Sequence, residues 1–329
     1  MKRVKIAQVG IGHDHAAPTY ESLRRQSDLF ELVGVAEPDP ARQDAIYPDA
    51  TRRTVEELLG MEDLEAVAIE TEERLATEYA QRFAERGVAV HMDKPGSQDL
   101  TAFTRLVETL RAKNLPLHMG YMYRYNPLIR RALDQARSGE LGEIFSVEAH
   151  MSVRHKPEKR QWLDQFQGGM MFFLGCHLID LVLQARGLPE EVLPMNSCTG
   201  IGCEGAEDYG FAVLRYKNGV SFVKTCATEY NGFARRQLVI CGSKGTIEIR
   251  PLEENRANGL THTRAAYTLA ADTPPDWAEG SEIHEGQTQR YDGMMASFAR
   301  IVRGEENPYS YDYELALFRT IMQCCGCKV

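Results

Sequence analysis

The first third of the chain alternates short apolar runs with amphipathic stretches of helical period, and this alternation constrains the fold more than any other feature. The predicted strands cover residues 4–9, 32–36, 66–69, 88–92 and 117–119. The predicted helices between them cover residues 19–25, 75–86 and 100–113. Parallel strands need a crossover that returns to the same edge, so strand and helix in turn indicate right-handed βαβ units. The pattern predicts an α/β domain with a doubly wound parallel sheet of the Rossmann type.

The pattern changes after residue 122. Asn126 and Pro127 predict a helix N-terminus, and Gly139 predicts its end. The strands expected beyond it are longer and alternate apolar with polar residues, over 144–153, 211–216, 220–227, 236–241 and 245–249. We therefore expect two domains, a Rossmann domain over residues 1–122 and an α+β domain with a largely antiparallel open sheet over residues 123–329. The polar segment 251–289 is expected to be a long irregular excursion over the surface.

Composition excludes several classes of protein. The formal net charge of -9 argues against binding to phosphate backbones, so no nucleic-acid partner is expected. The first apolar run breaks at Gly10 and Gly12, which argues against a signal peptide, and no apolar run is long enough to span a membrane. A cytoplasmic protein is expected. Eight cysteines lack a recognisable zinc spacing, so reduced thiols are expected, and the role of the terminal group stays open: Cys324, Cys325 and Cys327.

The loop behind the first strand predicts a dinucleotide site. Gly10 permits a tight turn and Gly12 lets the backbone approach a pyrophosphate, while His15 stands at the third glycine position. His13 and His15 can donate to phosphate. No metal is expected here, because one residue separates the two histidines and no further ligand is nearby in the sequence. Glu37 ends the second strand, where a carboxylate accepts from ribose hydroxyls and repels a 2′-phosphate, so NAD is favoured over NADP.

Two further groups can move protons. Lys94 follows the strand at 88–92, at the sheet edge where ligands of open α/β sheets bind, although a lysine at a strand end can simply be solvated. His177 and Asp180 are three residues apart on a predicted helix, so the carboxylate can orient the imidazole. The alternative for His177 is a buried histidine in the apolar core.

Several of these motifs, in this order, resemble the Gfo/Idh/MocA family of sugar and polyol oxidoreductases, and the resemblance covers nearly the whole chain. They are Gly10-x-Gly12, Glu37, Asp93-Lys94-Pro95, Arg124-Tyr125-Asn126-Pro127 and Gly175-x-His177-x-x-Asp180. The resemblance implies an NAD(P)-dependent oxidoreductase acting on a secondary alcohol of a sugar, polyol or sugar acid. Lys94 and His177 would flank the reacting carbon, one positioning the hydroxyl and the other relaying its proton, and Asp180 is the third catalytic residue expected, as the partner of His177. The remaining residues expected at the substrate are Tyr123, Arg124, Arg154, Trp162 and Phe173.

Phe173 departs from the family pattern, which has an aspartate four residues before the histidine. Either Asp164 substitutes for that acid, or the substrate presents an apolar face to Phe173, or the protein no longer oxidises a substrate. Two alternatives therefore stay open, namely a glycosidase or epimerase that retains its NAD, and a catalytically inactive regulatory protein that senses a ligand. One face of an antiparallel sheet can remain uncovered, so we expect a homo-dimer or homo-tetramer formed through the C-terminal sheet.

Overall fold

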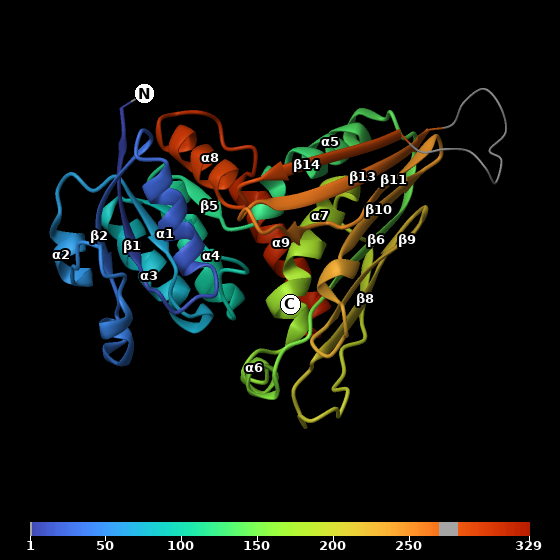
Figure 1. Ribbon diagram of the computed structural model, residues 1–329, viewed down its shortest axis with the longest axis horizontal. Coiled ribbons are helices and arrows are strands. Elements are labelled where there is room, and N and C mark those ends of the chain that lie inside the picture. The colour runs from blue at the N-terminus through green and yellow to red at the C-terminus, as the bar shows by residue number, and fades with distance from the viewer. Residues whose placement is uncertain (1, 270–281) are drawn as a thin grey trace. The chain divides into compact units, whose positions relative to one another are not determined.

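The computed structural model describes residues 2–269 and 282–329, and the chain folds into two compact units (Figure 1). The first unit comprises Met1–Met122 and Tyr291–Leu315, and the second comprises Tyr123–Arg290 and Ala316–Val329. Each unit has its own sheet.

The first unit is built on a five-stranded sheet in the order β2-β1-β3-β4-β5, in which every neighbouring pair is parallel. Its strands are β1 (Val4–Val9), β2 (Phe30–Ala36), β3 (Ala66–Ile69), β4 (Ala89–Met92) and β5 (Leu117–Met119). Its helices are α1 (Ala16–Arg25), η1 (Pro40–Ala45), α2 (Val55–Gly60), α3 (Glu73–Arg86), α4 (Leu100–Ala112) and α8 (Asp292–Val302), while η2 (Met122–Tyr125) spans the boundary and has Tyr123–Tyr125 in the second unit. The strand order reverses at β1, which has β2 on one side and β3 on the other, and ligands of such sheets bind beyond the carboxyl ends of strands at this point. The predicted parallel sheet is confirmed.

The second unit carries a larger sheet in which, among the described residues, only β6 and β9 pair in parallel. Its path is β12-β13-β11-β10-β6-β9-β8-β7, and β14 pairs with β13. The first of its strands are β6 (Ile144–Ser152), β7 (Glu191–Pro194), β8 (Tyr209–Tyr216), β9 (Gly219–Cys226), β10 (Gln237–Gly242) and β11 (Gly245–Ile249). Helices α5 (Pro127–Ser138) and α7 (Cys176–Arg186) pack against each other and against strands of this sheet (Figure 1). The prediction of a largely antiparallel sheet is confirmed.

Helix α5 begins and ends as the sequence predicts. The Asn126 side chain accepts hydrogen bonds from the backbone N–H groups of Leu128 and Ile129, and Pro127 lies in the first turn. Gly139 ends the helix at φ 80°, in the left-handed region that glycine adopts without strain. Other helices of this part are α6 (Pro157–Leu163), the π-helical turn η3 (Met171–Gly175), η4 (Phe233–Arg235) and α9 (Tyr311–Cys324), which continues from the first unit into the second.

The expectation of an irregular segment over 251–289 is wrong for its described parts. This stretch contains β12 (Glu254–Asn255), β13 (Thr261–Leu269) and β14 (Glu282–Thr288), while residues 270–281 lie outside the described residues. Strand β14 has no fully buried residue, so it lacks the apolar alternation that marks a half-buried strand. Its pairing with β13 comes from backbone hydrogen bonds that composition does not reveal.

The expected second domain, 123–329, also differs from the structure in one segment. The boundary after Met122 coincides with the observed division, but Tyr291–Leu315 folds with the first unit. Helix α8 explains this, because its Phe298 ring lies against His91 and His118, and its Asp292 pairs with Arg25 of α1. An amphipathic helix carries no signal in its sequence for which sheet it will cover. Within the described residues, no helix has the length and apolar character needed to cross a membrane.

Candidate active site

The glycine-rich loop lies between β1 and α1, at the switch point of the first unit's sheet. Gly10 has φ +93°, and a Cβ at this position would lie 2.5 Å from Thr71 Cα. The turn therefore runs so close to the chain after β3 that only glycine fits. His15 is the residue before α1 and occupies the N-cap position, and its carbonyl accepts from the N–H of Thr19. The helix thus begins where an anion can meet its N-terminus.

Glu37 lies beside this loop, as the sequence predicts for a ribose-binding carboxylate. Its Oε2 accepts from the backbone N–H of Ile11 at 2.7 Å, and its Oε1 accepts from that of Asp39 at 2.7 Å. The residue is buried. Arg42, which sequence reasoning did not single out, pairs with Asp39 and Glu72, and its Nε would lie 3.7 Å from a Cβ on Gly12. Its position five residues after Glu37 could have indicated that Arg42 lies near the nucleotide-binding loop.

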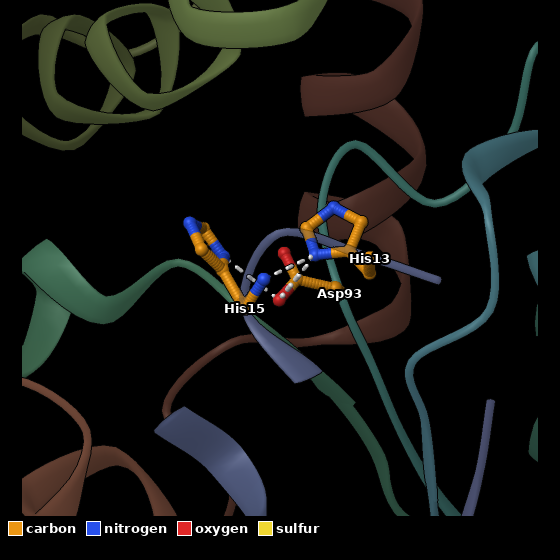
Figure 2. Close-up of side chains that lie close together, drawn as sticks. All are labelled: His13, His15 and Asp93. Carbon is orange, nitrogen blue, oxygen red and sulfur yellow. Dashed lines mark hydrogen bonds and ion pairs between the residues drawn. The ribbon is translucent and has the colours of Figure 1, made fainter. Parts of the chain in front are cut away.

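His13, His15 and Asp93 come together at the carboxyl ends of β1 and β4 (Figure 2). Asp93 Oδ2 lies 2.9 Å from His15 Nδ1 and 3.4 Å from His13 Nδ1. The backbone N–H of His15 also donates to His13 Nδ1 at 3.1 Å. Burial lowers the pKa of His13 to about 3. Burial acts to raise the pKa of Asp93, but His13, His15 and Lys94 outweigh it and hold that pKa below its usual range.

A second layer of buried polar groups lies behind this cluster. Glu70, at 0% exposure, follows β3 directly, with Oε2 3.9 Å from His13 Nδ1 and Oε1 3.8 Å from His91 Nε2. His91 Nδ1 in turn lies 2.7 Å from His118 Nδ1. Burial raises the pKa of Glu70 well above its usual value and lowers the pKa of His91 to about 4. Sequence reasoning missed Glu70, although its position at the end of a buried strand was a usable signal.

Lys94 is 1% exposed, so the alternative of a solvated lysine is wrong. It follows β4 and Asp93, and its backbone N–H donates to Asp93 Oδ1 at 2.7 Å. The first unit thus brings together the glycine-rich loop, both loop histidines and the chain segment of Lys94. The Lys94 role in proton transfer stays a prediction.

His177 lies on α7 in the second unit and is 2% exposed. The Tyr123 ring meets the imidazole edge-on, with centroids 5.1 Å apart. The Tyr123 hydroxyl donates to the buried carboxylate of Glu253, which also pairs with Arg236 and Arg290. Burial acts to raise the pKa of Glu253, but Arg290 and Arg236 outweigh it and lower that pKa. Tyr123 is therefore anchored at its hydroxyl while its ring packs on His177.

Asp180 and Arg124 form a buried ion pair, each with its side chain 1% exposed. Arg124 Nε donates to both carboxylate oxygens at 3.1 and 3.0 Å, and Nη2 donates to Oδ1 at 2.8 Å. Gln184 Nε2 also donates to Oδ2 at 2.8 Å. The ion pair with Asp180 is enough to explain why the Arg124 charge is buried, without contact to a substrate. The expected role of Asp180 in orienting His177 stays a prediction.

Phe173 is buried in an apolar cluster with Leu163, Met170 and Ala227. Trp162 meets it edge-on at 5.5 Å, and Lys159 Nζ lies 4.7 Å from the Phe173 ring centre. Asp164, the candidate substitute acid, is exposed at the end of α6. The surroundings of Phe173 in the described part of the chain are thus largely aromatic and apolar, with the Lys159 ammonium group and the His155 ring nearby.

Arg154 is exposed and lies over the Tyr230 ring at 4.1 Å. Both residues line a pocket of about 410 Å³ in the second unit, together with His155, Lys156, Pro157, Arg160, Ile201 and Thr228. The terminal cysteines are free thiols, and burial raises the pKa of both Cys324 and Cys325. Buried neutral thiols of this kind are poor metal ligands.

Comparison with known proteins gives a consistent result. Residues 4–121 match the model of the oxidoreductase family with an NAD-binding Rossmann fold, and residues 129–248 match the GFO/IDH/MocA C-terminal domain. The chain is 26% identical to D-xylose 1-dehydrogenase (NADP(+)) 2 of Haloferax volcanii, across 96% of this chain and 94% of that protein. It is 29% identical to inositol 2-dehydrogenase of Rhizobium meliloti, across 71% and 73% of the two chains. The structure of a 3-ketoreductase from Actinomadura kijaniata in complex with NADP superposes with a TM-score of 0.79 at 18% identity, covering 97% of this chain and 96% of that one.

Proposed function

The chain belongs to the Gfo/Idh/MocA oxidoreductase family, and from this premise we propose that it transfers a hydride between NAD and a secondary alcohol of a sugar, polyol or sugar acid. The observation that carries the proposal is Lys94, a buried lysine that follows a parallel strand of the sheet whose switch point holds the glycine-rich loop. An ammonium group in this position can hold the substrate hydroxyl and exchange its proton. The nicotinamide supplies the hydride chemistry when bound.

The residues of the loop fit a dinucleotide. Gly10 and Gly12 let the backbone approach the pyrophosphate, and His13 and His15 stand at the start of α1, where the N-terminus favours an anion. Glu37 presents a buried carboxylate for the ribose hydroxyls. This carboxylate favours NAD, whereas Arg42 beside Gly12 offers a cation to a 2′-phosphate. We propose NAD as the cofactor because Arg42 already pairs with Asp39 and Glu72.

In the second unit we assign His177 to proton transfer at the substrate hydroxyl. Tyr123 packs on its ring, and Arg124 fixes Asp180 one turn further along α7. Phe173 and Trp162 would offer an aromatic wall to an apolar face of a sugar ring, and Arg154 a cation to a carboxylate or hydroxyl. Each of these assignments is supported by a contact that lies within the second unit.

The test is nicotinamide absorbance during incubation with NAD or NADP and a panel of sugars, polyols and sugar acids. We expect a substrate-dependent rise that Lys94→Ala abolishes and that Lys113→Ala, an exposed lysine at the end of α4, leaves unchanged. Turnover retained in Lys94→Ala would remove Lys94 from the mechanism. The same panel establishes which class of alcohol is the substrate.

Phe173 favours a second candidate, because this phenylalanine, buried in an apolar cluster, stands where the family has an acid. The protein would then retain NAD and use transient oxidation, as a glycosidase or epimerase, or would bind ligands without turnover as a regulatory protein. Nucleotide retained through purification, with substrate conversion and no net NADH, identifies the first. Ligand binding without conversion of any substrate identifies the second.

We also propose a homo-dimer or homo-tetramer through the sheet of the second unit. Exposed apolar side chains on its strands include Phe145 on β6, Leu193 on β7 and Val220 on β9. Such side chains favour association with another surface. Light scattering after size exclusion measures the mass directly, and a monomer at all concentrations contradicts the proposal.

A further inference from the structure

We propose that His13, His15 and Asp93 bind a divalent transition-metal ion of the Zn²⁺ or Co²⁺ type. Their ligand atoms all lie within 4.8 Å of one another, and they come from two segments that the fold brings to one sheet edge (Figure 2). Sequence reasoning excluded a metal because no third ligand is near the histidines in the chain. Asp93, 78 residues after His15, supplies that ligand in space.

The spacing of the ligand atoms suits such an ion. Metal bonds of about 2.1 Å at tetrahedral angles place neighbouring ligand atoms about 3.4 Å apart. Asp93 Oδ2 is 3.4 Å from His13 Nδ1 and 2.9 Å from His15 Nδ1. The His15 backbone N–H now donates to the lone pair of His13 Nδ1, so a bound ion replaces this hydrogen bond. Small side-chain rotations therefore convert the cluster into a site.

An independent observation is the buried polar atoms around His13. Glu70 is at 0% exposure, neither of its oxygens makes a hydrogen bond of good geometry among the described residues, and Oε2 lies 3.9 Å from His13 Nδ1. A carboxyl group buried this way either keeps its proton or has a cation beside it, and a metal ion bound to His13 would supply that cation. On the far side of the ring, His13 Nε2 faces Glu73 Oε1 at 3.5 Å. A carboxylate behind a histidine is the usual outer partner of a metal-bound imidazole.

The donor set decides which ion fits. Two imidazole nitrogens and one carboxylate oxygen suit zinc, cobalt or iron, whereas magnesium and calcium take oxygen ligands. Three protein ligands also leave a coordination position open. Because Lys94 follows Asp93 directly, that position would lie near the segment to which the proposed function assigns proton transfer, but binding of the ion does not depend on that function.

The test uses the full chain, stripped with a chelator and titrated with Co²⁺ and, in a separate experiment, with Zn²⁺ by calorimetry. We expect one equivalent of Co²⁺ with visible d–d absorption. His15→Ala and Asp93→Asn should each weaken binding by more than the 10- to 100-fold that loss of an outer partner causes. His284→Ala is the matched control, since His284 is a partly exposed histidine of the second unit.

X-ray absorption of the wild-type zinc complex keeps the test independent of variants that fail to fold. We expect nitrogen and oxygen neighbours at about 2.0–2.1 Å and no sulfur at about 2.3 Å. Sulfur in the first shell would assign the ion to cysteines and overturn the proposal. So would the absence of stoichiometric binding to wild-type protein, or equal binding by His15→Ala. None of these results bears on turnover with NAD, so the proposed function and the metal site can fail separately.

Discussion

The ion pair between Arg124 and Asp180 offers a quantitative test of the second unit. Asp180→Asn keeps the side-chain shape but removes the carboxylate charge that faces the Arg124 guanidinium, a group that is 1% exposed. Arg124 makes three hydrogen bonds to this carboxylate, so the pair is closely matched in geometry. Removing one partner of a buried pair costs about 3–5 kcal/mol. In a domain of 150–250 residues this cost lowers Tm by about 6–20 °C.

The assay is thermal and urea unfolding followed by circular dichroism. Arg124→Met combined with Asp180→Leu removes both charges, and replacing a buried pair with apolar side chains is often neutral or stabilising. We therefore expect the double variant to recover most of the loss. The control is Glu191→Gln, which breaks an exposed pair with Arg215 and should leave Tm unchanged. A loss below about 1 kcal/mol in Asp180→Asn would refute the reasoning from burial.

The same variants separate two roles of Asp180. If it acts only by holding Arg124, the double variant regains kcat together with stability. If it also orients His177, the double variant is stable but slow, and the pH profile of kcat shifts because the imidazole has lost a nearby carboxylate. The comparison of kcat at matched stability therefore decides whether Asp180 is a positioning residue for His177.

Three further predictions concern the first unit. Gly10→Ala should abolish nucleotide binding and destabilise more than Gly87→Ala, because both glycines have positive φ but only Gly10 has a neighbour within 4 Å of the added Cβ; calorimetry with NAD and melting curves test this. Glu37→Ala should weaken NAD binding by about 10- to 150-fold, the equivalent of 1.5–3 kcal/mol for charged hydrogen bonds, and reduce the preference over NADP; an unchanged preference in titrations with both nucleotides contradicts the assignment. Burial lowers the pKa of His91 to about 4, below its unfolded value of 6.5, so the unfolded state binds the extra proton and stability falls as pH drops from about 6.5 to 4. His91→Gln should flatten this slope by up to about 1.4 kcal/mol per pH unit in urea unfolding, and an identical slope contradicts burial of a neutral His91.

The parts of the fold that the sequence predicts are those with local signals. Strands β1, β3, β5 and β11 have the predicted bounds, because the first three are short and largely apolar and β11 alternates apolar with polar residues directly after a turn. Helix α5 carries both its N-cap and its terminal glycine in the sequence. Strand β14 differs because its residues are largely polar on both faces. Helix α8 differs because it packs on the sheet of the first unit although it follows the segment Tyr123–Arg290 of the second unit in the sequence. Their placement depends on contacts distant in sequence.

The candidate site divides in the same way. The glycine-rich loop, Glu37 and Lys94 follow from their positions at strand ends, and the structure places all of them in the first unit. The relation of His13 to Asp93 and Glu70 could not be predicted, because it depends on which strands become neighbours and on which way the loop turns. Likewise, the spacing of His177 and Asp180 predicts that they can face each other, but not that Arg124 would reach Asp180 from η2.

Both units bury charge around the residues that we assign to proton transfer. Lys94 is next to Asp93, which His13 and His15 approach, and His177 packs on a tyrosine whose hydroxyl is held by Glu253 between two arginines. Buried ion pairs contribute little net stability, because desolvation offsets the attraction between the charges. Apolar residues would stabilise these positions at least as well. The charges are therefore better explained by orientation, since a buried network with fixed partners holds a side chain in one rotamer and one protonation state. On this argument, replacing Glu253 and Arg236 together by apolar residues should change the orientation of the His177 ring before it lowers the stability of the second unit.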